Sequence, residues 1–279
     1  MPAWLTSPWT DATSNIPPSR PWTLLCDGAR LSNNSGPALV ANGLQVDRAV
    51  YLTGGFTATG TGEIGAVNLA STRVGGVLHC DGARLSNDSG PALYANGLQV
   101  DQAVYLTGGF TATGAGDGVA VDLRQAQVGG TLVFDPATLE HTADAQGRLA
   151  VDGLTYAGVP EQITARAWQR LLREGTRRYA AQPYQQLAAG LRAQGDERQA
   201  RETLMAQRDD QLVRTHPPWP ERLWGRITKI TLGYGYQPWR ALLFLAAVLA
   251  LSCVLAVVLG SHGALVQTSS TAPLAGRAR

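Results

Sequence analysis

The histidines of this 279-residue chain are the first candidates for catalysis or metal binding. They are four in number and far apart in the sequence: His79, His141, His216 and His262. None has a second possible ligand at helical or strand spacing, as a zinc site would need. The sequence therefore predicts no metal site, and the histidines suggest no general acid or base.

The cysteines and glycines likewise indicate no reactive centre. Cys26, Cys80 and Cys253 form no CxxC pair, and we expect buried free thiols. The glycines at 60–62 and 114–116 lie in repeated turns and do not open a helix after a strand, as a dinucleotide-binding motif would. No P-loop and no GxSxG motif occurs. We predict no catalytic residue and no cofactor.

The acidic residues offer a different kind of chemistry, because some of them recur at a fixed spacing. Asp27 recurs as Asp81, and Asp47 recurs as Asp101 at the same spacing. Repeated acids of this kind form ladders, which are usually solvated turns but could bind a cation or a basic partner. Together with Tyr184, these four residues are the predicted interaction surface. The net charge of +2 gives no reason to expect nucleic acid as a partner.

The spacing of the acids reflects an internal repeat. Residues 26–79 align without a gap to residues 80–133, and 40 of the 54 positions are identical. Within each copy, pairs of small or branched apolar residues alternate with polar ones, as at Leu44/Val46 and Leu98/Val100. Gly, Asn, Asp and Ser interrupt these pairs, which predicts very short strands joined by tight turns. Such strands bury their faces only by stacking into a solenoid.

The size of the coils and the end of the array are also predicted. At roughly 20 residues per coil, each copy would hold two to three coils. A third, degraded copy is expected from Leu149, where LAVDGLTYAG echoes LQVDRAVYLTGG. The predicted fold class is mainly β: a short right-handed parallel β-helix, then an α-helical hairpin and one transmembrane helix.

This repeat resembles the pentapeptide-repeat-like β-helices of actinobacterial membrane proteins. The text CDGARLSN.SGPAL.ANGLQVD.AVYLTGGFTATG carries the resemblance, which covers Cys26 to Phe134 but only two full units. Relatives are often labelled membrane-associated oxidoreductases, which implies an enzymatic alternative, although no flavin, nicotinamide, haem or iron–sulfur motif is present. A second alternative is a DNA-mimicking inhibitor. Eight acids against five arginines in residues 26–133 give a net charge of only −3 for that role.

Helical patterns replace the repeat after Pro160. Trp168, Leu171 and Leu172 share one face of a predicted helix that ends near Gly175. A second apolar stripe begins at Tyr184, and Gly195-Asp196 offers a C-cap followed by the N-cap of a helix over 197–212. The hairpin resembles a tetratricopeptide-type unit. It is interpreted either as a structural cap on the β-helix or as a surface for docking a partner.

An apolar segment near the C-terminus predicts a membrane anchor. Residues 239–259 read WRALLFLAAVLALSCVLAVVL, long enough for one helix to cross a bilayer. Basic residues precede this segment, so the N-terminal part should be cytoplasmic and the tail outside the cell membrane. LGYGYQPWRALL also resembles the end of the same actinobacterial proteins. The predicted anchor residues are Trp239, Arg240, Leu242, Leu243, Phe244, Leu245, Val248, Leu249, Leu251, Val254, Leu255, Val257, Val258 and Leu259.

The predicted organisation has six segments. They are an irregular lead-in (1–25), a β-solenoid (26–159), a helical hairpin cap (160–213), a juxtamembrane linker (214–238), a transmembrane helix (239–259) and a disordered tail (260–279). The function predicted from this order is a membrane-anchored, non-catalytic interaction scaffold with an unknown protein partner. The uncapped solenoid end or the span could also pair two chains.

Overall fold

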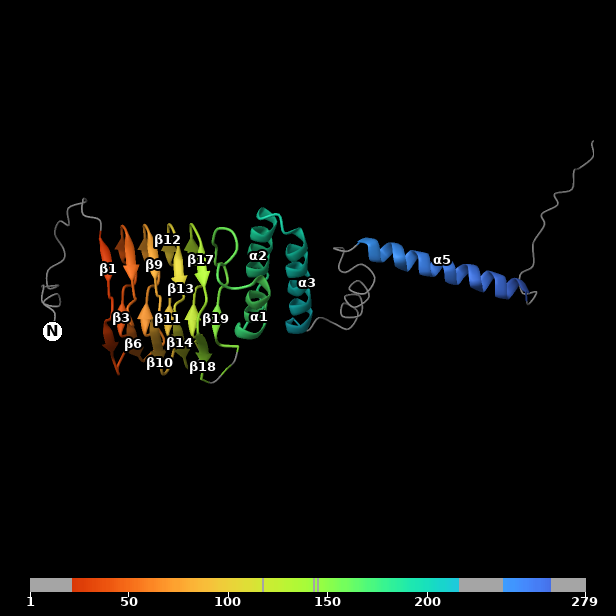
Figure 1. Ribbon diagram of the computed structural model, residues 1–279. Coiled ribbons are helices and arrows are strands. Elements are labelled where there is room, and N and C mark those ends of the chain that lie inside the picture. The colour runs from red at the N-terminus through yellow and green to blue at the C-terminus, as the bar shows by residue number, and fades with distance from the viewer. Residues whose placement is uncertain (1–21, 117, 143, 145, 216–237, 262–279) are drawn as a thin grey trace, which may run out of the picture. The chain divides into compact units, whose positions relative to one another are not determined.

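The computed structural model describes residues 22–116, 118–142, 144, 146–215 and 238–261. The chain divides into two compact units, and the boundary lies between Thr215 and His216. In the first unit the described residues form a parallel β-solenoid followed by helices α1, α2 and α3 (Figure 1). In the second they form helix α5. Residues 216–237 of the predicted linker and residues 262–279 of the predicted tail lie outside the described residues.

Four parallel sheets, named A to D here, make the four faces of the solenoid. In spatial order, sheet A consists of β1 (Thr23–Leu25), β5 (Ala49–Tyr51), β9 (Val77–His79), β13 (Val104–Leu106) and β17 (Leu132–Phe134). Sheet B consists of β2 (Arg30–Ser32), β6 (Thr57–Gly60), β10 (Arg84–Asn87), β14 (Thr111–Gly114) and β18 (Thr138–His141).

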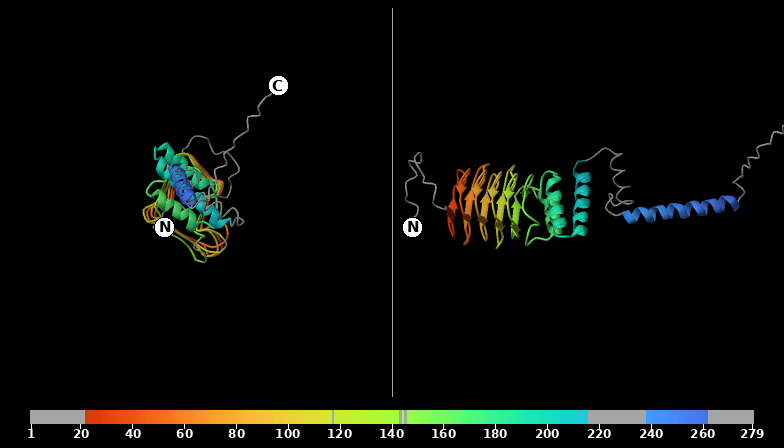
Figure 2. Two further views of the ribbon diagram at one scale, coloured as in Figure 1. Left: turned by 90° about the vertical axis from the view of Figure 1, so that its right-hand side faces the viewer. Right: turned by 90° about the horizontal axis from the view of Figure 1, so that it is seen from above.

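The other two faces have the same construction. Sheet C consists of β3 (Leu39–Val40), β7 (Val67–Asn68), β11 (Leu93–Tyr94), β15 (Val121–Asp122) and β19 (Leu149–Ala150). Sheet D consists of β4 (Gln45–Val46), β8 (Arg73–Val74), β12 (Gln99–Val100) and β16 (Gln127–Val128). Each strand pairs with the strand one coil away, so the coils lie one on another (Figure 2). The predicted parallel solenoid is confirmed, and its handedness stays a prediction.

The coils are longer than predicted. Thr23 pairs with Ala49, and Ala49 pairs with Val77, so one coil of sheet A runs from Thr23 to Ala49 and the next from Ala49 to Val77. One copy of the repeat therefore holds two coils, and not three. The predicted coil length was too short because each coil has a strand and a turn on each of four faces.

Inward-facing side chains form one apolar ladder on each face. In sheet D the ladder is Val46, Val74, Val100 and Val128, all buried. In sheet B it alternates between leucine and alanine: Leu31, Ala58, Leu85, Ala112 and Leu139. The ladders form one continuous core, which no single coil could bury alone.

The repeated VGG text is explained by the close stacking of the coils. A Cβ atom on Gly76 would lie 1.9 Å from the backbone oxygen of Arg48 in the previous coil. A Cβ atom on the equivalent Gly130 would lie 2.2 Å from the backbone oxygen of Gln102. A side chain at either position would push neighbouring coils apart, so glycine is required there.

Two details of the predicted solenoid need correction. Strand β1 begins at Thr23, inside the range predicted as an irregular lead-in. The alignment could not reveal it, because identity between the copies starts only at Cys26. At the other end, Leu149 pairs with Val121 of sheet C, so LAVDGL is equivalent to LYANGL at 93–98 and not to LQVDRA. The equivalent segment is identified by the pairing of backbone strands and not by local sequence similarity.

The helices begin and end close to the predicted positions. Helix α1 spans Ala165–Gly175, α2 spans Gln182–Ala193 and α3 spans Glu197–Arg214. The Asp196 carboxylate caps α3 by accepting a hydrogen bond from the Gln199 N–H, as the sequence predicted. Gly195 before it has a φ of +82°, a left-handed conformation suited to glycine.

Helices α1 and α2 cover the last coil of the solenoid. The Trp168 ring packs edge-on against the Phe134 ring, with their centroids 5.1 Å apart. Trp168 is 1% exposed, so it closes the end of the apolar core. The Gln182 side chain accepts a hydrogen bond from the Gly153 N–H and donates one to the Leu154 carbonyl, and Gln186 donates to the Tyr156 carbonyl. These contacts satisfy backbone groups that would otherwise form an open edge, so the first interpretation, a structural cap, fits this surface.

Helix α5 spans Pro238–Ser261, and its side chains are described from Leu245 to Val258. Within the described part of the chain, no helix is both long and apolar enough to cross a membrane. The span predicted for residues 239–259 is therefore not supported by the structure and stays a prediction. The side chains of the predicted anchor residues Trp239, Arg240, Leu242, Leu243, Phe244 and Leu259 lie outside the described part.

Candidate functional site

The first predicted acid ladder exists, but its members are two coils apart. The Asp27 carboxylate accepts a hydrogen bond of 2.7 Å from the Thr53 hydroxyl in the next coil. The Asp81 carboxylate accepts one from Thr107 in the same way. The pattern continues to Asp135, one coil beyond Thr107 and outside the two aligned copies. Asp27 is exposed and Asp81 half-buried, so both are accessible from the surface.

The second acid ladder is interrupted by glycine. Asp47 and Asp101 are exposed, and Gly75 and Gly129 occupy the equivalent positions in the coils that follow them. Two strand spacings are about 10 Å, too far for two carboxylates to share one cation. No group of three or more metal-ligating side chains occurs among the described residues. The ladders therefore present separate carboxylates at the surface.

Tyr184 is not part of the surface. Its side chain is 2% exposed and its hydroxyl donates a hydrogen bond of 3.0 Å to the buried Asp210 carboxylate. Burial, with Asp210 beside it, raises the pKa of Tyr184. Arg214 donates to Asp210 at 3.0 Å and to the Thr176 carbonyl at 2.8 Å. This network joins α3 to α2 and to the loop after α1, so Tyr184 is a core residue of the cap.

An outward-facing aromatic stack was missed in the sequence. The His79 ring lies between Tyr51 and Tyr105 on sheet A, with ring centroids 5.3 and 4.2 Å apart and nearly parallel planes. The Asp81 carboxylate lies 3.3 Å from the His79 Nδ1 atom. The signal was available, because the two tyrosines occupy equivalent positions in the two copies and His79 lies about halfway between them.

The two cysteines of the repeat occupy equivalent positions but differ in exposure. Cys80 is fully buried, and burial, helped by the nearby Asp81 charge, raises the pKa of its thiol. Cys26, in the first described coil, is half-buried, and burial raises its thiol pKa as well. A raised pKa leaves little thiolate, so neither residue is suited to nucleophilic chemistry. Cys253 is exposed on α5, contrary to the expectation of a buried thiol.

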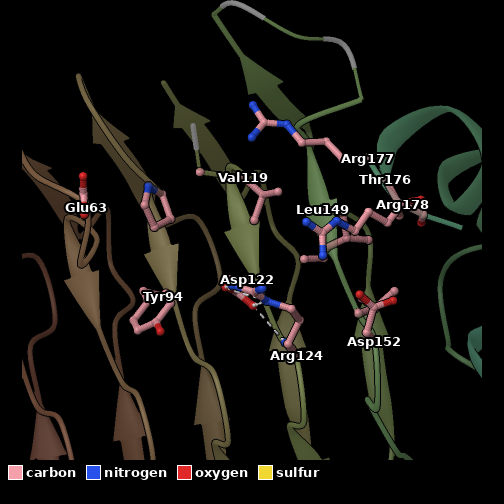
Figure 3. Close-up of a pocket in the computed structure, with 14 residues that line it drawn as sticks. Glu63, Tyr94, Val119, Asp122, Arg124, Leu149, Asp152, Thr176, Arg177 and Arg178 are labelled. Carbon is pink, nitrogen blue, oxygen red and sulfur yellow. Dashed lines mark hydrogen bonds and ion pairs between the residues drawn. The ribbon is translucent and has the colours of Figure 1, made fainter. Parts of the chain in front are cut away.

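A concave polar site lies on the outer face of sheet C. A cleft of about 280 Å³ is lined there by side chains of β11, β15 and β19 and by the loop after α1. Figure 3 shows Tyr94, Asp122 and Arg124 on the sheet side and Arg177 and Arg178 entering from the loop. Both the solenoid and the cap therefore line the cleft.

An ion pair between a buried carboxylate and an exposed arginine lies in this cleft. Asp122 is 1% exposed, and Arg124 donates to both of its carboxylate oxygens, with Nε at 3.0 Å from Oδ1 and Nη2 at 2.5 Å from Oδ2. This bidentate geometry is the strong form of the interaction. Burial raises the pKa of the neighbouring Asp152 carboxyl, whereas Arg124 opposes the shift. The cleft therefore contains one carboxylate paired with an arginine, Asp122, and one whose pKa is raised, Asp152.

The loop from the cap is held over the cleft by a second ion pair. Arg177 Nε donates to the Asp144 carboxylate at 2.9 Å, and its Nη2 lies 3.4 Å from His141 Nε2. The backbone N–H of Gln146 and Arg177 lower the pKa of Asp144. Arg178, next in the sequence, is exposed. The cleft offers donors and acceptors of both charges, which suits a small polar ligand better than a strongly charged one.

A difference between the two copies of the repeat could have indicated this cleft from the sequence. The two copies are nearly identical over their first 35 positions and diverge after them, where Asn68 and Ala70 of the first copy are replaced by Asp122 and Arg124 in the second. Positions where similar repeats diverge are free of the common stacking requirement. In this chain the divergence produces the ion pair of Asp122 and Arg124.

No family model matches this sequence, and comparisons with curated proteins and with solved structures likewise find no match.

Proposed function

We propose that this protein is a non-enzymatic interaction scaffold tethered to a membrane. The observation that carries the proposal is the solenoid itself, which repeats exposed side chains on fixed faces at intervals of two coils. Asp27, Asp47, Asp81 and Asp101 are spaced in this way. Repeat architectures commonly use such extended surfaces to bind other proteins.

The tether is proposed from the sequence of α5. The apolar sequence at 239–259 would cover about 30 Å as a continuous helix, at about 1.5 Å per residue. Its described side chains are exposed, and they include Leu249, Val254 and Val257. A helix that is apolar on all sides needs an apolar environment, and a bilayer provides one. The basic residues before the helix favour a cytoplasmic solenoid.

The tether is tested by alkaline carbonate extraction of membranes that contain the full-length chain. We expect the wild-type protein to stay in the membrane pellet and the double variant Leu249→Arg/Val254→Arg to be released. Val213→Arg is the matched control, because Val213 is also an exposed apolar residue but lies on α3. Release of the wild-type protein would refute the tether.

The absence of enzymatic activity is tested separately by native mass spectrometry of the detergent-solubilised, full-length protein. We expect masses of the chain, alone or with a partner protein. A stoichiometric extra mass that matches a flavin, a nucleotide or a metal would overturn the scaffold and favour the oxidoreductase alternative.

In-cell photocrosslinking from Asp47 and Asp101 then tests whether the repeated faces contact another protein. If no position on the solenoid crosslinks, the scaffold proposal fails.

A further inference from the structure

Every face of the solenoid has five positions, and only sheet A continues into a sixth. On sheet C the fifth position is β19, on sheet D it is Thr155, which bridges to Gln127, and on sheet A Glu161 bridges to Val133 in the sixth position. The chain then enters α1, whose N-cap is Thr164, and leaves the solenoid. In the described chain, sheet B therefore ends at β18, and no strand follows in the sixth position.

The outer edge of β18 has backbone groups that point away from its neighbour. The N–H groups of Thr138 and Thr142 donate to the carbonyls of Phe110 and Gly114 in the previous coil. Because alternate residues of a parallel strand bond to opposite neighbours, the N–H and C=O of Leu139 face outward. In the described chain, no hydrogen bond links these outward groups to the cap, whereas Gln182 covers the turn at 153–154. An open edge of this kind is a template for another strand.

A cavity of about 470 Å³ lies beside this edge. Its apolar lining comes from Phe134, Leu139, Ile163, Ala167 and Leu171. The inward ladder of sheet B alternates between leucine and alanine and ends at Leu139, so a small side chain would continue the pattern. The cavity could therefore accept the inward side chains of an added strand.

The charged side chain on β18 itself favours one kind of partner: Glu140 is exposed, whereas the two carboxylates and two arginines that line the cavity balance each other. Asp135, Glu140 and Glu174 are exposed carboxylates, and Arg170 is an exposed guanidinium. Arg148, which also lines the cavity, is half-buried. Glu140 projects outward from β18 beside Leu139, so a basic residue opposite it would form a favourable cross-strand pair.

We propose that the outer edge of β18 and its cavity bind an extended peptide of a partner protein as the sixth strand of sheet B. The bound segment alternates small apolar residues, which enter the cavity, with basic residues, which face Glu140. Backbone hydrogen bonds to Leu139 supply affinity, and the alternating side chains supply specificity, as in other strand-addition complexes. This inference rests on the proposed scaffold function and identifies the class of partner for one face.

The test uses the full-length protein in detergent and a fluorescein-labelled peptide of sequence Lys-Ala-Lys-Val-Lys-Ala-Lys. We expect saturable binding by fluorescence anisotropy and slower hydrogen exchange at the Leu139 amide. Replacing every lysine by glutamate should weaken binding at least tenfold. N-methylation of alternate residues should abolish binding in one register and leave it within threefold in the other. Equal binding of the acidic peptide, or no protection at Leu139, would overturn the proposal.

A charge reversal on the protein completes the test. Glu140→Lys should weaken binding of the basic peptide at least tenfold, because the cross-strand attraction becomes repulsion. Glu197→Lys, an exposed change of the same type on α3, should leave binding unchanged. If Glu140→Lys binds as well as the wild-type protein, the inference is wrong. If no peptide binds while photocrosslinks still form on other faces, this inference fails and the scaffold stands.

Discussion

The solenoid and the helical cap achieve their stability in different ways. In the solenoid each apolar residue has equivalents one coil above and below, as in the valine ladder of sheet D. In the cap single residues have no equivalents: Trp168 seals the core, and Asp210 with Arg214 joins the helices. A repeat spreads the free energy of folding over many similar contacts, whereas a cap concentrates it in a few. Substitutions in the two regions should therefore differ in effect.

Trp168→Ala should have the largest effect. The ring is 1% exposed and packs against Phe134 at the end of the core, so its removal leaves a large cavity. We expect a loss of about 3–5 kcal/mol in the free energy of unfolding, measured by urea denaturation. A loss under about 1 kcal/mol would show that the last coil does not need α1 to close it.

Asp210→Ala should come next. Asp210 is 2% exposed and accepts hydrogen bonds from Tyr184 and Arg214, so its removal leaves the Arg214 guanidinium without its carboxylate. We expect a loss of about 3 kcal/mol in the free energy of unfolding. Tyr184→Phe removes only the hydroxyl and should cost about 1–2 kcal/mol. If the two changes cost the same, the ion pair contributes nothing beyond the tyrosine hydrogen bond.

Gly190→Ala tests the contact between cap and solenoid by the sign of its effect. A Cβ atom on Gly190 would lie 1.9 Å from the Gly158 carbonyl oxygen. In a helix free of the solenoid, alanine would stabilise α2 by about 1 kcal/mol. With the helix packed as described, we expect a destabilisation of about 2 kcal/mol in urea melts. A stabilised variant would mean that α2 does not lie against the last coil.

Ser71→Gly should have the smallest effect and the opposite sign. Ser71 has a φ of +52°, and the equivalent turn positions one coil away carry Gly43 and Gly97, with φ values of +68° and +67°. Glycine removes the left-handed strain, so we expect a gain of about 0.5–1 kcal/mol in thermal or urea unfolding. Gly97→Ser is the reciprocal change and should cost a similar amount. Effects of the same sign at both positions would contradict this account.

The sequence predicted some features of the molecule well and others poorly, for physical reasons. The short strands and the helices were readable because apolar spacing and caps such as Asp196 are local signals. The coil length was misjudged because turns between faces have no fixed length. Tyr184 was placed on the surface because helical periodicity identifies an apolar stripe but not what covers it. The cleft was missed because Asp122 and Arg124 line it together with residues that are distant in sequence, such as Arg177.

The sequence by itself determined that this chain is a repeat protein, because two closely similar copies, 26–79 and 80–133, must fold alike and can bury their short strands only by stacking. Tertiary structure alone decided which residues meet where the repeat stops. The cleft that brings Asp122 and Arg124 near the loop after α1, the Gln182 contacts that close one face and the open edge at Leu139 all depend on how the last coil meets α1 and α2. A repeat specifies its own continuation, but its end is specified by contacts between residues that no local pattern links.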